Sequence, residues 1–176
     1  MADNRLTLYG PNEVSAALER MAADILRRQN ALPVLVGIRR GGAHLMSRLK
    51  VILEEKTATS VTTGVVDINL YRDDWTLARS LPKVGPTDLP FKLEGKRIIL
   101  VDDVLYTGRT VRAALGALAE FGRASRVELM VLVDRGHREM PIQPDYTPFC
   151  ISTLKSDIVE VTFQENGPGI EVVLIA

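Results

Sequence analysis

The sequence contains one cysteine, Cys150, and only two histidines among its 176 residues. A single cysteine cannot form an intramolecular disulfide, which favours a reducing, cytoplasmic location. So few thiol and imidazole groups also argue against a zinc or iron–sulfur site. The sequence lacks a signal peptide and any run of about 18 apolar residues, so it predicts a protein that is neither secreted nor inserted in a membrane.

The chain also lacks net charge, because 22 Lys and Arg residues balance 22 Asp and Glu residues. A strongly basic chain would point to nucleic acid, so binding of that kind needs a local basic patch here. The length and the 46% hydrophobic content suit one domain with a sizeable core, spanning residues 1–176.

Short β-branched runs alternate with helical periodicity along the chain. Strands are predicted at 33–38, 60–71, 97–101 and 126–134, and helices at 12–29, 41–53 and 108–121. IVEVTF and IEVVLI flank QENGPG near the end, which predicts a terminal hairpin. The alternation predicts an α/β fold with a Rossmann-like, mostly parallel sheet flanked by helices.

Apolar periodicity disappears between residues 72 and 95, where Pro82, Gly85, Pro86 and Pro90 interrupt the chain. Loops of this length are uncommon in compact domains and are usually functional lids or disordered segments. We therefore expect a mobile loop here, with an exposed surface loop as the alternative.

The stretch ILVDDVLYTGRTV (99–111) places Asp102 and Asp103 after an apolar run and before Thr107-Gly108. Ligands bind beyond the carboxyl ends of parallel strands, and a helix N-terminus offers N–H groups to phosphate. Carboxylates beside a phosphate suit sugar hydroxyls or a hard cation such as Mg²⁺. The stretch predicts a phosphosugar site, although each part alone is typical of a solvated turn or a threonine-capped helix start.

This stretch resembles the motif of type I phosphoribosyltransferases, which bind phosphoribosyl pyrophosphate (PRPP). With DINLYRDD (67–74) and VDRGHREMP (133–141), the chain is similar to the PyrR family from its first helix to about Val161. That family comprises pyrimidine operon attenuators with uracil phosphoribosyltransferase activity. The resemblance implies the type I fold with a small hood, residues 72–95 as the mobile hood loop, PRPP and uracil as substrates, and Mg²⁺ held by Asp102, Asp103 and PRPP.

The resemblance also implies residue roles. The carboxylates would hold the ribose hydroxyls, residues 107–110 the 5′-phosphate, and GIRRGGA (37–43) the pyrophosphate. The family usually reads Thr-Arg-Gly where this chain has Arg40-Gly41-Gly42, which leaves open whether Arg39 or Arg40 binds pyrophosphate. The expected catalytic residues are Asp102, Asp103 and Arg40. The expected substrate-binding residues are Arg39, Arg40, Arg72, Asp102, Asp103, Val104, Leu105, Tyr106, Thr107, Gly108, Arg109, Thr110, Arg135 and Val159.

Three of these residues, Tyr106, Arg135 and Val159, are expected to lie beside the base. Related purine enzymes typically have an acid at the position of Tyr106, so a tyrosine favours a pyrimidine, although an aromatic packed beside the loop is an equal alternative. By resemblance, Arg135 stacks over the base. Backbone groups near Val159 would read the uracil carbonyl and imide groups.

The family further implies binding of pyrimidine operon leader RNA, control by UMP and UTP, and a homo-oligomer. The expected RNA-binding residues are Arg20, Arg27, Arg28, His137 and Arg138. A solvated basic helix face is the alternative for the first three, and Glu19, where the family often has threonine, would repel RNA phosphates. Two other functions stay open: an RNA-binding regulator without catalysis, and a purine phosphoribosyltransferase without an RNA role.

Overall fold

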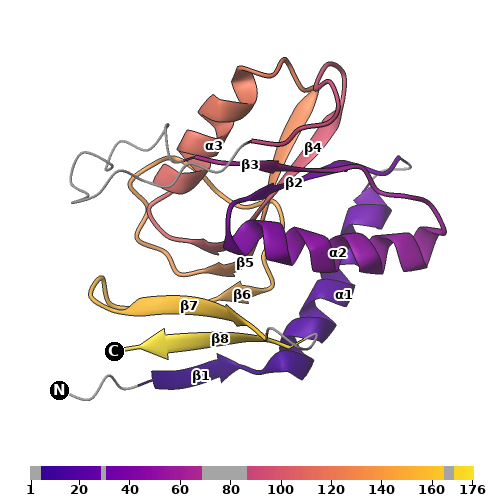
Figure 1. The fold of residues 1–176 in the computed structure, drawn as a ribbon. Helices are drawn as coiled ribbons and strands as arrows, with labels where there is room; N and C mark the ends of the chain where they lie inside the picture. Colours follow the sequence, from indigo (N-terminus) through magenta and orange to yellow (C-terminus); the bar gives the residue numbers. More distant parts are fainter. Residues whose placement is uncertain (1–4, 29–30, 69–86, 165–168) are drawn as a thin grey trace.

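The structure is a computed structural model that describes residues 5–28, 31–68, 87–164 and 169–176. Within these residues the chain forms two sheets and three helices (Figure 1). In chain order the elements are β1 (Arg5–Tyr9), α1 (Pro11–Arg28), β2 (Val34–Ile38), α2 (Gly41–Thr57), β3 (Thr63–Val66), β4 (Arg97–Leu105), α3 (Arg109–Ala119), β5 (Arg126–Asp134), β6 (Phe149–Cys150), β7 (Ile158–Phe163) and β8 (Ile170–Ile175).

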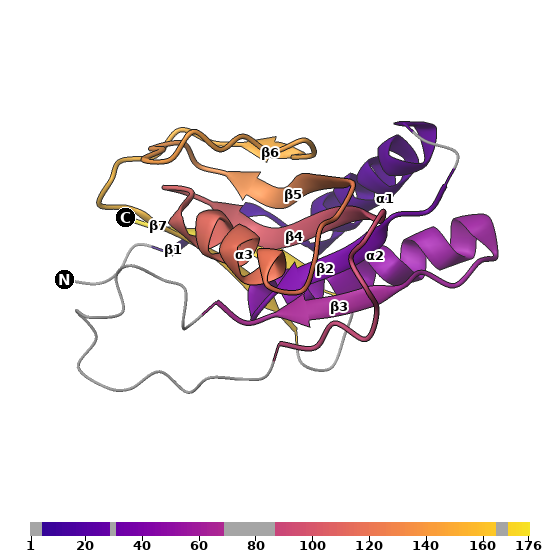
Figure 2. The same cartoon turned by 90° about the horizontal axis from the view of Figure 1, so that it is seen from above.

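The larger sheet has five strands in the order β3-β2-β4-β5-β6, and every pairing is parallel (Figure 2). Val36 of β2 pairs with Gly64 of β3 on one side and with Leu100 of β4 on the other. This arrangement confirms the predicted Rossmann-like parallel sheet. Because the strands are parallel, the carboxyl ends of β2, β4 and β5 meet at one edge.

Helices cover both faces of this sheet. Leu35, Ile99 and Val101 pack with α1 and α2, whereas Val36 and Leu100 pack with α3 on the opposite face. Side chains of a strand alternate between its two faces, so a strand buried on both sides reads as a continuous apolar run. None of the helices in the described part of the chain has the length and hydropathy required to cross a membrane.

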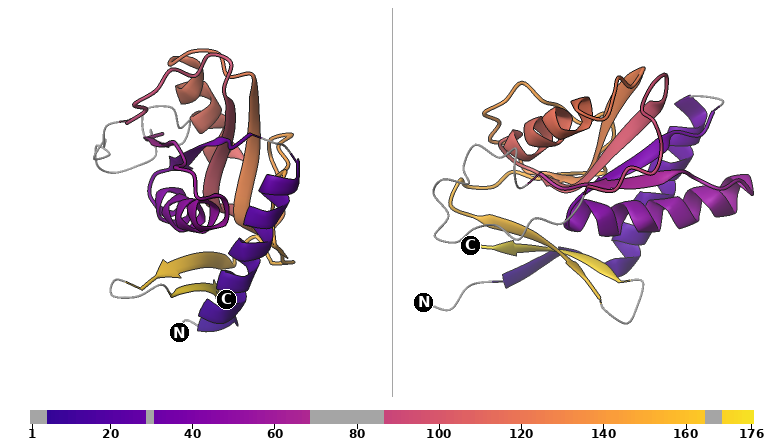
Figure 3. Two further views of the ribbon diagram at one scale, coloured as in Figure 1. Left: turned by 90° about the vertical axis from the view of Figure 1, so that its right-hand side faces the viewer. Right: turned by 45° about the horizontal axis from the view of Figure 1, so that its top comes forward.

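A second sheet has the order β1-β8-β7 and is antiparallel. It lies on the α1 and α2 side of the molecule, away from α3 (Figure 3), where Ile170 and Val172 join the same core as Val14 of α1. The β7–β8 hairpin confirms the prediction from IVEVTF and IEVVLI. The sequence did not predict β1, whose pairing with β8 joins the two ends of the chain.

The structure corrects the expected limits of three segments. The strand expected at 97–101 continues to Leu105, so the acids lie within β4. The expected C-terminal limit of the mobile loop, residue 95, extends too far into the packed part of the chain. Asp88 pairs with Val65, and Leu93 is 1% exposed. Of the strand expected at 60–71, only Thr63–Val66 forms β3 in the described residues. Residues 69–86, which include Arg72, lie outside the described residues.

Candidate active site

Residues 106–108 connect β4 to α3, and residues 106–110 line a cavity of about 430 Å³. Gly108 precedes α3 with φ +90°, a conformation that side chains disfavour, and Arg109 N donates to Thr107 Oγ1 at 3.3 Å. The first N–H groups of a helix have no intrahelical acceptor and suit an anion. The expected substrate-binding residues that line this cavity are Asp102, Val104, Leu105, Tyr106, Thr107, Gly108, Arg109 and Thr110.

The carboxylates of Asp102 and Asp103 face two different loops. Asp102, which is 6% exposed, lines the cavity of residues 106–110. The carboxylate of Asp103 lies against α2 instead, because a Cβ built on Gly41 would be 1.9 Å from Asp103 Oδ2. Asp103 N donates to Asp102 Oδ1 at 3.1 Å, and Val104 N donates to Asp103 Oδ1 at 2.9 Å. Backbone donors thus orient both carboxylates.

The glycines of GIRRGGA allow α2 to begin directly against β4. A Cβ on Gly42 would lie 2.2 Å from the carbonyl oxygen of Val101, and one on Gly37 would lie 2.6 Å from Ala43 Cα. Both clashes involve backbone, which cannot move aside cheaply. These glycines therefore bring the start of α2 to the acids of β4.

Arg39 and Arg40 line a second cavity, of about 340 Å³, together with His44. Their surroundings differ. Arg39 Nε lies 3.8 Å from Oδ2 of buried Asp67, whereas the Arg40 side chain has no hydrogen bond or ion pair to any described residue. The peptide bond between the two arginines is cis.

Arg135 and Tyr106, which the family resemblance assigns to the base, lie against each other. The Arg135 guanidinium lies 4.2 Å from the centroid of the Tyr106 ring. Its Nε donates to Thr153 Oγ1 at 3.2 Å and its Nη2 to Leu154 O at 2.8 Å. Val159 lies in β7 with its side chain in the core, so only its backbone can serve a ligand.

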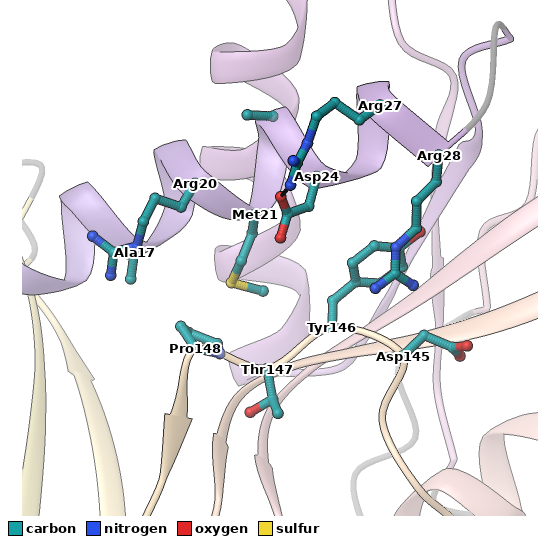
Figure 4. Close-up of a pocket in the computed structure, with 11 residues that line it drawn as sticks. Ala17, Arg20, Met21, Asp24, Arg27, Arg28, Asp145, Tyr146, Thr147 and Pro148 are labelled. Atoms are coloured by element: carbon teal, nitrogen blue, oxygen red, sulfur yellow. Dashed lines mark hydrogen bonds and ion pairs between the residues drawn. The ribbon is translucent and has the colours of Figure 1, made fainter.

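The expected RNA-binding residues fall into two groups. Arg20, Arg27 and Arg28 line a hollow of about 500 Å³ between α1 and residues 145–148 (Figure 4). There the Arg28 guanidinium lies 4.4 Å from the centroid of the Tyr146 ring.

His137 and Arg138 instead follow the carboxyl end of β5. His137 Nε2 hydrogen-bonds Thr153 O at 2.7 Å, and Arg138 Nη2 bonds Asp134 Oδ2 at 2.5 Å. Tyr146 N, by contrast, bonds Leu129 O, five positions before Asp134 on β5. The hollow with the three arginines of α1 therefore lies near Leu129 of β5, whereas His137 and Arg138 lie beyond Asp134 at its carboxyl end. The two groups do not form one surface within a single chain.

Comparisons with known proteins agree with this geometry. A model of the phosphoribosyl transferase domain matches residues 8–166. The bifunctional protein PyrR of Citrifermentans bemidjiense is 47% identical over 99% of this chain and 99% of its own. That of Geobacter sulfurreducens is 48% identical with the same coverage of both chains. This chain belongs to the PyrR family of phosphoribosyltransferases.

Solved structures of proteins with more distant sequences share the fold of this PyrR family member. A hypoxanthine phosphoribosyltransferase of Staphylococcus aureus has a TM-score of 0.69 at 21% identity, over 94% of this chain and 89% of that one. An HGPRT-ase of Leishmania tarentolae, solved with GMP, has a TM-score of 0.63 at 17% identity, over 84% and 82% of the two chains. These similarities confirm the type I phosphoribosyltransferase fold.

Sequence reasoning missed two residues that line the cavity of residues 106–110, Val111 and Glu139. Glu139 lines the cavity, and its Oε2 accepts from Arg109 Nε at 2.6 Å. An acid beside a phosphate site has no local signal in the sequence, since its partner is 30 residues away.

The donors present fit a Mg²⁺ ion only when a substrate completes its coordination. Among the described residues no three His, Cys, Asp or Glu side chains gather as a metal site. Asp102 and Asp103 are neighbours in the sequence whose carboxylates face different loops, and Mg²⁺ at phosphate sites is commonly held by one or two carboxylates plus substrate phosphates.

Proposed function

We propose that this protein transfers the phosphoribosyl group of PRPP to uracil, forming UMP and pyrophosphate, and that it binds pyrimidine operon leader RNA as a transcription attenuator. The observation that carries the enzymatic part is the contact of Asp103 with Gly41. It joins the acids and the phosphate loop of β4 to the arginine pair that precedes α2. One edge of the sheet would therefore offer groups for every part of PRPP.

PRPP would lie along this edge. Its 5′-phosphate would bind residues 107–110, its ribose hydroxyls Asp102 and Asp103, and its pyrophosphate Arg40. Departure of pyrophosphate leaves positive charge on the ribose ring, and fixed carboxylates beneath the ring stabilise that charge. Arg39 would position the loop through Asp67. These roles need no covalent intermediate, since orientation and electrostatics supply the rate enhancement.

Because Asp102 lines the cavity of residues 106–110 and Asp103 lies against Gly41, a Mg²⁺ ion that PRPP brings would be held by one of these carboxylates together with oxygens of the substrate. When bound, the ion would neutralise charge on the departing pyrophosphate. The remaining work belongs to side chains of the protein, which orient the sugar and exclude water from it.

Uracil is supported by the family resemblance and by the aromatic ring at position 106. The guanidinium of Arg135 covers one face of the Tyr106 ring, so a planar pyrimidine would stack on the other face of the guanidinium. Backbone groups near Val159 would then read the base edge. A purine-only enzyme stays the alternative, and an acceptor panel separates the two.

RNA binding is supported by the hollow beside α1. Arg20, Arg27 and Arg28 supply positive charge there, and the buried ring of Tyr146 packs against the guanidinium of Arg28. Glu19, which we expected to repel RNA phosphates, has its Oε2 2.6 Å from Lys56 Nζ, and this ion pair would offset its charge. UMP and UTP would control RNA affinity from the active site. We place this activity in the cytoplasm and in a homo-oligomer.

The enzymatic proposal is tested by incubating the protein with PRPP, Mg²⁺ and labelled uracil, hypoxanthine or guanine. We expect UMP and no purine nucleotide. Asp103→Asn should remove most turnover, because the ring charge loses a fixed carboxylate. Purine nucleotide alone would overturn the choice of base, and no product with any base would favour a regulator without catalysis.

RNA binding is tested separately by gel shift with a pyrimidine leader transcript, with and without UMP. Arg28→Gln should weaken binding, and Asp103→Asn should leave it intact. Arg123→Gln is the matched control, since this exposed arginine lies far along the chain from the hollow. Equal affinity of Arg28→Gln and the unmodified protein would contradict the assigned surface.

A further inference from the structure

The guanidinium of Arg138 is enclosed just beyond β5. Its side chain is 15% exposed, and all three of its nitrogens donate within the chain. Nη2 bonds Asp134 Oδ2 at 2.5 Å, Nη1 bonds Tyr106 O at 3.0 Å and Gly136 O at 3.3 Å, and Nε bonds Ile142 O at 2.9 Å. These four bonds use four of the five N–H groups of the guanidinium, and turning Arg138 outward to an RNA phosphate would leave the carboxylate of Asp134, which is 16% exposed, without this partner.

These bonds connect the phosphate loop, residues 106–110, to the segment 134–142. The same two segments meet at further points. Thr107 O accepts from Glu139 N at 2.9 Å and from Met140 N at 3.0 Å. A Cβ on Gly108 would be only 3.1 Å from Met140 Cβ, so the loop packs closely along the segment.

The direction of these bonds has a consequence for phosphate binding. A trans peptide is planar, so its N–H points opposite to its C=O. Arg138 holds the carbonyl of Tyr106, and residues 139 and 140 hold the carbonyl of Thr107. The N–H groups of Thr107 and Gly108 are therefore directed away from the segment 134–142. Consecutive N–H groups oriented in this way form an anion-binding concavity.

We propose that Arg138 is a positioning residue of the phosphoribosyltransferase site, which keeps the phosphate loop in the geometry that binds the 5′-phosphate by tying Tyr106 O to Asp134 and Ile142. This inference rests on the proposed function. It gives Arg138 a role inside the enzyme in place of the RNA contact expected from the sequence. His137 and Arg135 hold the neighbouring residues 153 and 154, so the same segment also orders the base side.

The test compares two inhibitors that occupy different parts of the PRPP site. Ribose 5-phosphate reports on the phosphate loop, and pyrophosphate reports on the loop of Arg39 and Arg40. In Arg138→Gln we expect the inhibition constant of ribose 5-phosphate to rise about tenfold or more, because charge-assisted bonds that orient the loop are lost. That of pyrophosphate should change less than about twofold. Arg123→Gln, which removes an exposed arginine, should change neither.

Arg138→Lys is the second variant. It keeps the positive charge beside Asp134 but cannot reach all four acceptors, so ribose 5-phosphate should bind with intermediate affinity. Leader RNA affinity should stay unchanged in both variants. An equal loss for both inhibitors in the lysine variant would indicate general damage and overturn the proposal, as would unchanged ribose 5-phosphate binding or a selective loss of RNA binding. If the unmodified protein binds neither inhibitor, the proposed function fails instead.

Discussion

The carboxylate of Asp103 lies directly against Cα of Gly41, so closely that a methyl group there would come within 1.9 Å of Oδ2. This contact joins the carboxyl end of β4 to the first residue of α2. It positions Asp103 relative to the arginine pair, because any side chain at residue 41 would displace the carboxylate of Asp103.

Gly41→Ala should therefore impair catalysis more than folding. We expect turnover to fall about a hundredfold, since a displacement of about 1 Å in an active site has that effect. The free energy of unfolding should fall by about 1–3 kcal/mol. Steady-state kinetics and urea unfolding measure the two effects.

Gly116→Ala is the matched control, because nothing lies within 4 Å of a Cβ at this position in α3. It should leave turnover unchanged and raise stability by up to about 1 kcal/mol, the usual gain of alanine in a helix. Normal turnover in Gly41→Ala would show that the contact of residues 41 and 103 does not matter for catalysis.

Arg40→Gln and Arg39→Gln should separate binding from positioning. Arg40→Gln should raise the inhibition constant of pyrophosphate about tenfold, with little change in the melting temperature, because a charge-assisted contact to the ligand is lost. Arg39→Gln removes a countercharge of Asp67, which is 5% exposed, and should lower stability by about 1 kcal/mol. Inhibition kinetics and thermal unfolding distinguish the variants. If Arg39→Gln weakened pyrophosphate binding and Arg40→Gln lowered stability, Arg39 would be the ligand contact and Arg40 the positioning residue.

Glu139→Gln should strengthen phosphate binding. Glu139 lines the phosphate cavity and holds Arg109 by an ion pair of 2.6 Å. Removal of the Glu139 charge frees the guanidinium of Arg109 to contact the ligand. It also removes the repulsion between the Glu139 carboxylate and the phosphate. Ribose 5-phosphate should bind about threefold more tightly at low salt, and the gain should shrink as ionic strength rises.

Glu55→Gln serves as its control, since this exposed acid lies near the far end of α2 from the site. It should have no effect on ribose 5-phosphate. Weaker binding in Glu139→Gln would mean that the ion pair orders the loop more than its charge repels phosphate.

Tyr146 should make stability depend on pH in the alkaline range. Burial raises the pKa of its phenol above 10.0, and Glu128 adds to the rise, while Arg97 and Arg28 oppose it. Above about pH 10 the unfolded chain therefore loses this proton first, so the contribution to stability falls as pH increases. Urea unfolding at pH 9 and pH 11 should show a smaller decline for Tyr146→Phe than for the unmodified protein. An equal decline would contradict this assignment.

Much of the fold could be predicted from local patterns. Strand β5 has the predicted limits of 126–134, and α3 begins next to Gly108 as expected. Such elements follow from residue propensities and periodicity, which are properties of short segments. β1 was missed because it is a short strand whose partner, β8, is at the other end of the chain.

The sequence by itself determined which chemical groups follow which strand, because covalent order places Asp102, Asp103 and residues 107–110 beside one helix start. Only the tertiary structure decided what those groups face. It turned the two acids toward different loops, since consecutive side chains of a strand point to opposite sides. It also enclosed Arg138 among Tyr106, Asp134 and Ile142, a set of partners that forms only when distant segments pack together.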